Sequence, residues 1–236
     1  MAPKGSRSGG LVGAGLATAA MMTVVGGFID AYTYLSHGVF ARAQTGNVIF
    51  LAVGVVQDRP FARFLWPILA YAVGVLLAHA LRLASSARTR WALAAAIGAQ
   101  VLVLVVIGTL PTSTAMEAVV LPLSAIGGLQ LALFRSAGGI TFVSIATTGN
   151  LMRFIEAATA AFRRRSREQV RVMAFTALIV AAFAAGAFAG AGTTRVVGHS
   201  GIWGAALLQL VVLALFLWDS DPARTPPGAA VSAHQP

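Results

Sequence analysis

The tripeptide Thr-Gly-Asn occurs twice in this apolar chain, at residues 45–47 and 148–150. An apolar, helix-like segment follows each copy at once, VIFLAVGVV after the first and LMRFIEAATAAF after the second. Thr and Asn are common N-caps of helices, and Gly permits a tight turn. At each copy we therefore predict an irregular segment, a capped turn and a short helix of roughly 10–13 residues, too short to cross a bilayer.

The start of such a helix could bind a polar solute or an anion. Its first N–H groups are unpaired, and that end of the helix dipole is positive. The residues that could line a solute path are Gln44, Thr45, Gly46 and Asn47 at the first copy and Thr148, Gly149 and Asn150 at the second. The alternative is that the tripeptides only cap their helices and pack small residues between neighbouring spans.

Asp30 is the one acidic residue well inside an apolar segment of membrane length. A carboxylate at membrane depth is costly, and it often marks a proton or cation site. The alternative is that Asp30 lies near the outer end of its helix, hydrogen-bonded to an adjacent helix or to Arg42.

Membrane helices are the elements that would position these groups. The 236-residue chain is 58% hydrophobic and only 10% charged, with a mean hydropathy of +0.81, whereas soluble domains carry about 25% charged residues. Six segments suit spans of roughly 20 residues. They are residues 11–35, 62–84, 91–110, 117–135, 171–194 and 201–218. The predicted fold is therefore all-α, a polytopic membrane helix bundle.

The net charge of +10 comes from basic residues that lie mostly between the apolar segments. This distribution indicates membrane topology rather than nucleic-acid binding, and it predicts a multi-pass protein of the cell (inner) membrane with both termini cytoplasmic. Residues 1–10 would be a cytoplasmic tail, 11–218 the membrane domain, and the polar, Pro-rich residues 219–236 a disordered cytoplasmic tail. The basic start resembles a signal peptide, but its apolar run continues past Ala20, so we expect it to be retained.

A second match supports an internal repeat. GGFIDA at 26–31 corresponds to GGLQLA at 127–132, about as far apart as the two tripeptides. The chain thus divides into halves at 11–110 and 117–218, each with three predicted spans. Because three is odd, the second half must be inverted in the membrane relative to the first, an architecture found in many transporters.

Other patterns exclude several function classes. The chain has no Cys, its four His residues are scattered, and it contains no nucleophile–base, phosphate-loop or zinc-protease motif. We therefore predict no enzymatic activity, no cofactor and no metal. We expect Gln100, Gln130 and Gln209 to hydrogen-bond between helices, and GAFAGAG at 186–192 to form a closely packed helix face.

The stretch GGFIDAYTYLSHGVFARAQTGNVIFLAVG resembles the YoaK family of small bacterial membrane proteins, also called the domain-of-unknown-function 1275 family. The family's pattern is Gly-x-x-Asp-Ala, a hydrophobic stretch and Thr-Gly-Asn. It maps to Gly27, Asp30, Ala31, Thr45, Gly46 and Asn47. The resemblance covers nearly the whole chain apart from both tails, and TTGNLM resembles a weaker second copy. It implies a multi-span inner-membrane protein but no activity, because the family's function is not established. Leu131 stands where a symmetric repeat would place a second Asp30.

The function favoured by these patterns is secondary transport of a small solute, by rocking of the two halves around a central site. A proton-coupled form would use Asp30. The alternatives are a channel-like pore built from two half-helices and a non-transporting membrane scaffold. The expected partners are the lipid bilayer and a small solute, with no nucleic acid; a homo-oligomer, the solute and the coupling ion are left open.

Overall fold

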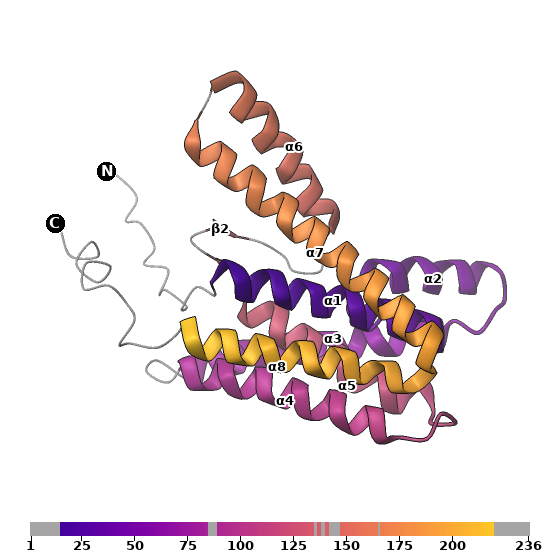
Figure 1. Ribbon diagram of the computed structural model, residues 1–236. Coiled ribbons are helices and arrows are strands. Elements are labelled where there is room, and N and C mark those ends of the chain that lie inside the picture. Colours follow the sequence, from indigo (N-terminus) through magenta and orange to yellow (C-terminus); the bar gives the residue numbers. More distant parts are fainter. Residues whose placement is uncertain are drawn as a thin grey trace.

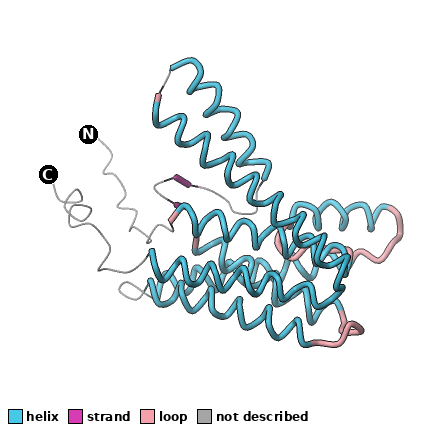
Figure 2. Tube along the Cα trace, in the orientation of Figure 1, coloured by secondary structure: helices cyan, strands magenta, loops and turns pink. Residues whose placement is uncertain are grey.

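The computed structural model describes residues 15–84, 89–134, 136–137, 140–141, 147–164 and 166–219. This part of the chain is almost entirely helical (Figure 2). Its α-helices are α1 (Leu16–His37), α2 (Gln44–Val56), α3 (Ala62–Ala84), α4 (Thr89–Thr109), α5 (Met116–Leu133), α6 (Thr147–Arg164), α7 (Arg167–Val197) and α8 (Ile202–Asp219). A 3-10 turn, η1 (Gly198–Gly201), joins α7 to α8, and β1 (Ser136–Ala137) pairs antiparallel with β2 (Ile140–Thr141). The predicted tails lie outside the described residues, apart from Asp219 at the end of α8.

The six segments predicted as spans correspond to α1, α3, α4, α5, α7 and α8, with ends that differ by a few residues. Four stretches of the described chain are long and apolar enough to cross a membrane. They are Leu16–His37, Ala62–Leu81, Met116–Leu133 and Arg167–Trp218, the last of which contains both α7 and α8. The helical fold with membrane-length apolar helices is thus confirmed. The number of spans and their inverted arrangement stay predictions, and the short β1–β2 pair was not predicted.

The long helices pack in pairs (Figure 1). Helix α1 lies along α7, α3 lies along α5, and α4 lies along α8. Contacts of α8 with α1 and of α5 with α4 join these pairs into one bundle. Helix α6 packs against α7, and in Figure 1 α6 and the first part of α7 project together from the rest of the bundle.

Glycines allow the closest of these helices to meet backbone to backbone. A Cβ atom at Gly186 or Gly190 of α7 would overlap the α1 backbone at Val24 or Phe28. Close approach of this kind is typical of helix pairs in membranes. The predicted packing role is confirmed for Gly186 and Gly190. It is wrong for Gly192, where an added Cβ would meet no atom within 4 Å.

Large apolar side chains are exposed along the outside of the bundle. Leu76 on α3 is 66% exposed, Phe188 on α7 is 80% exposed and Leu207 on α8 is 65% exposed. So extensive an apolar surface is unfavourable in water but suits contact with lipid chains.

A histidine ties together helix ends that are distant in sequence. The Tyr32 hydroxyl of α1 lies 2.8 Å from Nδ1 of His199 in η1. The other ring nitrogen, Nε2, lies 2.8 Å from the carbonyl oxygen of Ile107 in α4. These two contacts hold the turn between α7 and α8 against α1 and α4, close to the C-terminal end of α1.

Candidate functional site

The Asp30 carboxylate of α1 is hydrogen-bonded to the segment that connects α1 to α2, residues 38–43. Asp30 is only 3% exposed. Its Oδ1 accepts hydrogen bonds from the backbone N–H groups of Arg42 at 2.8 Å and Ala43 at 3.3 Å. Its Oδ2 is also buried but has no hydrogen-bond partner among the described residues. Asp30 is therefore bonded to the backbone of Arg42, and one carboxylate oxygen remains available.

The first Thr-Gly-Asn lies inside α2 rather than before it. The helix begins at Gln44, and its N-cap residue is Ala43, which makes no side-chain capping bond. The predicted capping role of the first copy is therefore wrong. Asn47 instead reaches back over the preceding turn: its Nδ2 donates to the Phe40 carbonyl at 2.7 Å, and its Oδ1 accepts from the Phe40 N–H at 3.0 Å. The side chain thus takes up both backbone polar groups of one residue.

Gln44 adds further hydrogen bonds to those by which Asn47 anchors the connection between α1 and α2. Asn47 Nδ2 also donates to Gln44 Oε1 at 2.8 Å, and Gln44 Nε2 donates to the Ala41 carbonyl at 2.8 Å. Gly46 provides space rather than a turn, because a Cβ there would lie 2.6 Å from Cε2 of the Phe40 ring. Thr45 is exposed. Asp30, Gln44 and Asn47 are thus brought together around the 38–43 connection, which they hold in place.

Replacement of Asn47 by Leu is expected to lower the stability of the protein measurably. The change leaves the partly buried backbone N–H and carbonyl groups of Phe40 without partners, and each unpaired buried group costs about 1–3 kcal/mol. We expect a loss of about 2–4 kcal/mol in the free energy of unfolding, measured by thermal unfolding of the purified protein in detergent. Thr45→Ala, at the exposed position of the same tripeptide, should change the midpoint little. Equal losses in the two variants would contradict the anchoring role.

The second Thr-Gly-Asn lies in the first turn of α6. Asn150 is buried, whereas Thr148 and Gly149 are exposed. With 18 residues, α6 is longer than the predicted short helix, whereas the 13 residues of α2 agree with it. Helix α2 packs on α3 and α6 packs on α7. The predicted irregular approach, residues 142–146, lies outside the described residues.

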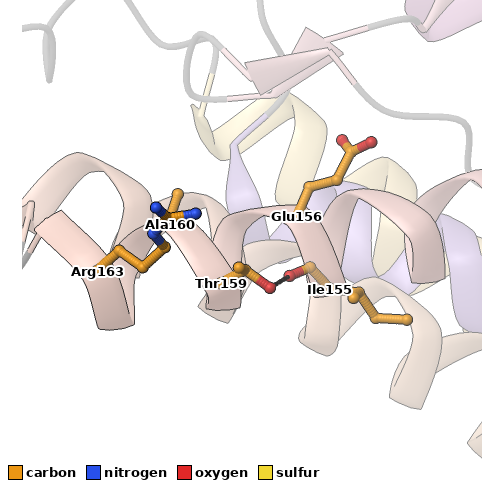
Figure 3. Close-up of a pocket in the computed structure, with 5 residues that line it drawn as sticks. All are labelled: Ile155, Glu156, Thr159, Ala160 and Arg163. Atoms are coloured by element: carbon orange, nitrogen blue, oxygen red, sulfur yellow. Dashed lines mark hydrogen bonds between the residues drawn. The ribbon is translucent and has the colours of Figure 1, made fainter.

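A surface groove follows one face of α6. It has a volume of about 660 Å³ and is lined by Ile155, Glu156, Thr159, Ala160 and Arg163. Figure 3 shows the Glu156 side chain pointing away from that of Ile155, and the Thr159 hydroxyl donates to the Ile155 carbonyl at 2.8 Å. Every lining residue belongs to one helix, and its polar side chains are exposed. The groove is therefore a weaker candidate than the buried groups around Asp30.

Arg42 was predicted only as a possible hydrogen-bond partner of Asp30, and the structure makes it a candidate site residue in its own right. Its place between apolar segments suggested a charge at the membrane surface, but its side chain is only 3% exposed. It lies against α5, where a Cβ at Gly127 would be 2.9 Å from Arg42 Cγ. Its Nε and Nη2 atoms are buried and have no hydrogen-bond partner in the described part of the chain. The sequence feature that could have indicated this role is an Arg in a short connection, twelve residues after an Asp within an apolar helix.

Two further polar residues lie on the α5 face that meets Arg42. Ser124, Gly127 and Gln130 follow one another at three-residue spacing, which places them on one side of the helix. The Ser124 hydroxyl and both amide atoms of Gln130 are buried without a partner among the described residues. We refer to Asp30, Arg42, Ser124 and Gln130 as the Asp30–Arg42 site.

Gln100 of α4 and Gln209 of α8 show the same property. Both atoms of each side-chain amide are buried without a hydrogen-bond partner in the described chain. The predicted bonds between helices are therefore wrong for all three glutamines. Buried polar groups nearly always have a partner, so groups like these point to a bound solute or to water.

One comparison with known proteins gives a result. A family described as a protein of unknown function, DUF1275, matches residues 18–215. The chain belongs to the DUF1275 family. Neither the curated proteins nor the solved structures gave a match.

The DUF1275 match includes both tripeptides and the whole Asp30–Arg42 site. Within the described residues of this DUF1275 protein, no group of three or more His, Asp or Glu residues could hold a metal ion. The chemistry present at the site consists of one guanidinium, one carboxylate, one amide and one hydroxyl. These groups can bind a small polar or charged solute and can carry a proton.

Proposed function

We propose that this DUF1275 protein is a secondary transporter of a small solute in the cell membrane. The observation that carries the proposal is the set of buried polar groups without partners at the Asp30–Arg42 site. Ionisable residues inside a membrane bundle are costly, and they commonly mark the path of an ion or a substrate. A protein that served only as a scaffold would have no need of these groups, because well-packed apolar side chains in their place are often neutral or stabilising.

The packing of the helices supports two inverted halves, α1–α4 and α5–α8. If α5 is the counterpart of α1 and α7 that of α3, the α1–α7 contact between the halves corresponds to the α5–α3 contact, which also joins the two halves. The glycines agree with this correspondence. A Cβ at Gly27 of α1 would overlap the Phe183 carbonyl of α7, and a Cβ at Gly128 of α5 would overlap the Tyr71 carbonyl of α3. Six spans would place both termini on the same side of the membrane, and the distribution of Lys and Arg favours the cytoplasmic side.

The proposed solute site lies where the first helix of one half faces the first helix of the other. Asp30 belongs to α1, and the α5 face with Ser124 and Gln130 meets Arg42. Inverted-repeat transporters commonly bind their substrates at the interface between the repeats. Rocking of the halves would then expose this site to each side of the membrane in turn.

Asp30 is the proposed proton carrier. Its Oδ1 is occupied by two backbone N–H groups, whereas Oδ2 is free to take a proton without breaking these bonds. The equivalent position in the second half is Leu131, so a single carboxylate would couple transport to the proton gradient.

Uptake into proteoliposomes tests this function. A panel of small solutes would be added to vesicles that contain the protein and a pH-sensitive dye, with and without an imposed proton gradient. We expect saturable, gradient-driven uptake that shows counterflow, accompanied by proton entry. Solute flux that neither saturates nor shows counterflow would indicate a channel. Absence of all uptake, together with a stoichiometric co-purifying protein, would indicate a scaffold.

A further inference from the structure

The guanidinium of Arg42 is a buried cation, and one of its edges has no hydrogen-bond partner among the described residues. An arginine side chain stays protonated at all accessible pH values, so burial cannot neutralise it. A buried charge without a hydrogen-bonded partner is strongly destabilising. Nε and Nη2 of Arg42 are both buried and lack partners in the described chain. They require acceptors that the described residues do not supply.

Asp30 makes no hydrogen bond to Nε or Nη2 of Arg42 in the described chain. Asp30 and Arg42 are the only charged residues among the buried residues that the structure describes. The Asp30 carboxylate, however, bonds the backbone N–H of Arg42 and not its guanidinium. No ion pair joins the two side chains in the described part of the chain. The carboxylate therefore balances the charge of Arg42 from nearby. It leaves the Nε–Nη2 edge, which we call the open edge, without a hydrogen-bond acceptor in the described chain.

This open edge has the geometry of a carboxylate receptor. The N–H bonds of Nε and Nη2 are nearly parallel, and together they form a rigid fork that matches the two oxygens of a planar carboxylate. We propose that the transported solute is a small organic monocarboxylate whose two oxygens are bound by Nε and Nη2 of Arg42. This inference rests on the proposed function and names the substrate class for the same site.

The charge of the site favours a monoanion over a dianion. Arg42 and Asp30 together carry no net charge, so a bound monocarboxylate adds one negative charge. A proton on Asp30 Oδ2 would cancel that charge, which links the anion to the proton that accompanies it. The groups that act electrostatically on this pair are the two residues themselves and Tyr71 on α3. A dianion such as phosphate would leave a buried negative charge uncompensated.

Two further groups could complete the recognition of the solute. The Gln130 amide and the Ser124 hydroxyl lie one turn to either side of Gly127, where the Arg42 side chain crosses α5. The missing side chain at Gly127 is what allows Arg42 to lie this close to the helix. An amide and a hydroxyl suit the carbonyl or hydroxyl group of a small acid next to its carboxylate.

Ligand-induced thermal stabilisation of the purified protein tests the inference without requiring transport. Acetate, lactate and benzoate would each be compared with acetamide, lactamide and benzamide, and with chloride, nitrate and phosphate. At least one acid should raise the melting midpoint by about 3–6 °C at high excess over its Kd, whereas its matched amide should not. Arg42→Gln should abolish the shift, and Arg42→Lys should weaken binding about tenfold or more because Lys lacks the fork.

Gln130→Glu provides a second variant with a different signature. It places a carboxylate on the face that meets Arg42, where it would occupy the open edge. We expect it to melt at a higher temperature than the wild type without ligand and to lose the shift with acids. This variant keeps the test decisive even if the Arg42 variants do not fold.

Several results would overturn the inference. These are no shift of the wild type with any of the acids, equal shifts with acids and amides, a response to inorganic anions alone, or a full response in Arg42→Gln. Binding and transport can fail separately. Carboxylate binding without uptake would reject the transporter but keep the site, whereas uptake of neutral solutes only would reject the carboxylate and keep the transporter.

Discussion

Asp30→Asn is expected to remove the dependence of solute uptake on the proton gradient while the protein stays folded. An asparagine side chain retains one oxygen that can accept the N–H groups of Arg42 and Ala43, as Oδ1 of the carboxylate does. Its amide nitrogen takes the place of Oδ2, which can then no longer bind a proton. Uptake would be measured in proteoliposomes with and without an imposed gradient, together with proton entry.

Asp30→Ala separates the anchoring role of this residue from its coupling role. Both variants lose the charge that balances Arg42, but only Asp30→Ala leaves the N–H groups of Arg42 and Ala43 without their acceptor. Each unpaired group costs about 1–3 kcal/mol, which together corresponds to a drop of roughly 10 °C in the melting midpoint for a chain of this size. We therefore expect Asp30→Ala to be much less stable than Asp30→Asn.

Glu117→Gln provides the control for loss of an acidic charge. Glu117 lies in the first turn of α5 and is exposed. Its replacement should change neither gradient dependence nor stability appreciably. Transport by Asp30→Asn that remains fully driven by the gradient would reject proton coupling through Asp30. Equal stability of the Asn and Ala variants would reject the anchoring role.

Patterns that depend on local sequence predicted the helices well. The six long helices follow from continuous apolar runs, and no contact between distant residues is needed to recognise them. Asp30 was identified for the same reason, because a single carboxylate in an apolar run is visible without a structure. The start of a helix at each Thr-Gly-Asn was also predictable, since an apolar segment begins there, although α6 is longer than predicted.

The interior of the site depends on contacts that local patterns do not contain. Arg42 is buried because Gly127, 85 residues later, lets its side chain lie against α5. Gln130 lacks a bond because of what surrounds it in the bundle, although its type suggests an interhelical hydrogen bond. Asn47 is a frequent N-cap residue, but here its amide fits both backbone groups of Phe40, a match that requires the path of residues 38–43.

Gly190→Leu is expected to disrupt the packing of α1 against α7. A Cβ at Gly190 would overlap the carbonyl oxygen of Phe28 and lie 2.8 Å from its Cα atom. These are backbone atoms, so the clash cannot be relieved by rotating a side chain. Overpacking of a tight contact costs about 1–3 kcal/mol for a few extra methylenes, and a whole leucine side chain between two backbones should exceed this range. We expect loss of folded, monodisperse protein in detergent, measured by size-exclusion chromatography and thermal unfolding.

Gly192→Leu is the matched control on the same helix. Gly192 is exposed, two residues further along α7, and an added Cβ there meets no atom within 4 Å. Leucine is also a better helix former than glycine by up to about 1 kcal/mol, so this variant should be at least as stable as the wild type. Because both variants add the same side chain to one helix, a difference between them isolates the contact with α1. Equal behaviour would mean that the spacing of α1 and α7 does not depend on a glycine, and it would weaken the proposed equivalence with the contact that Gly128 of α5 makes with α3.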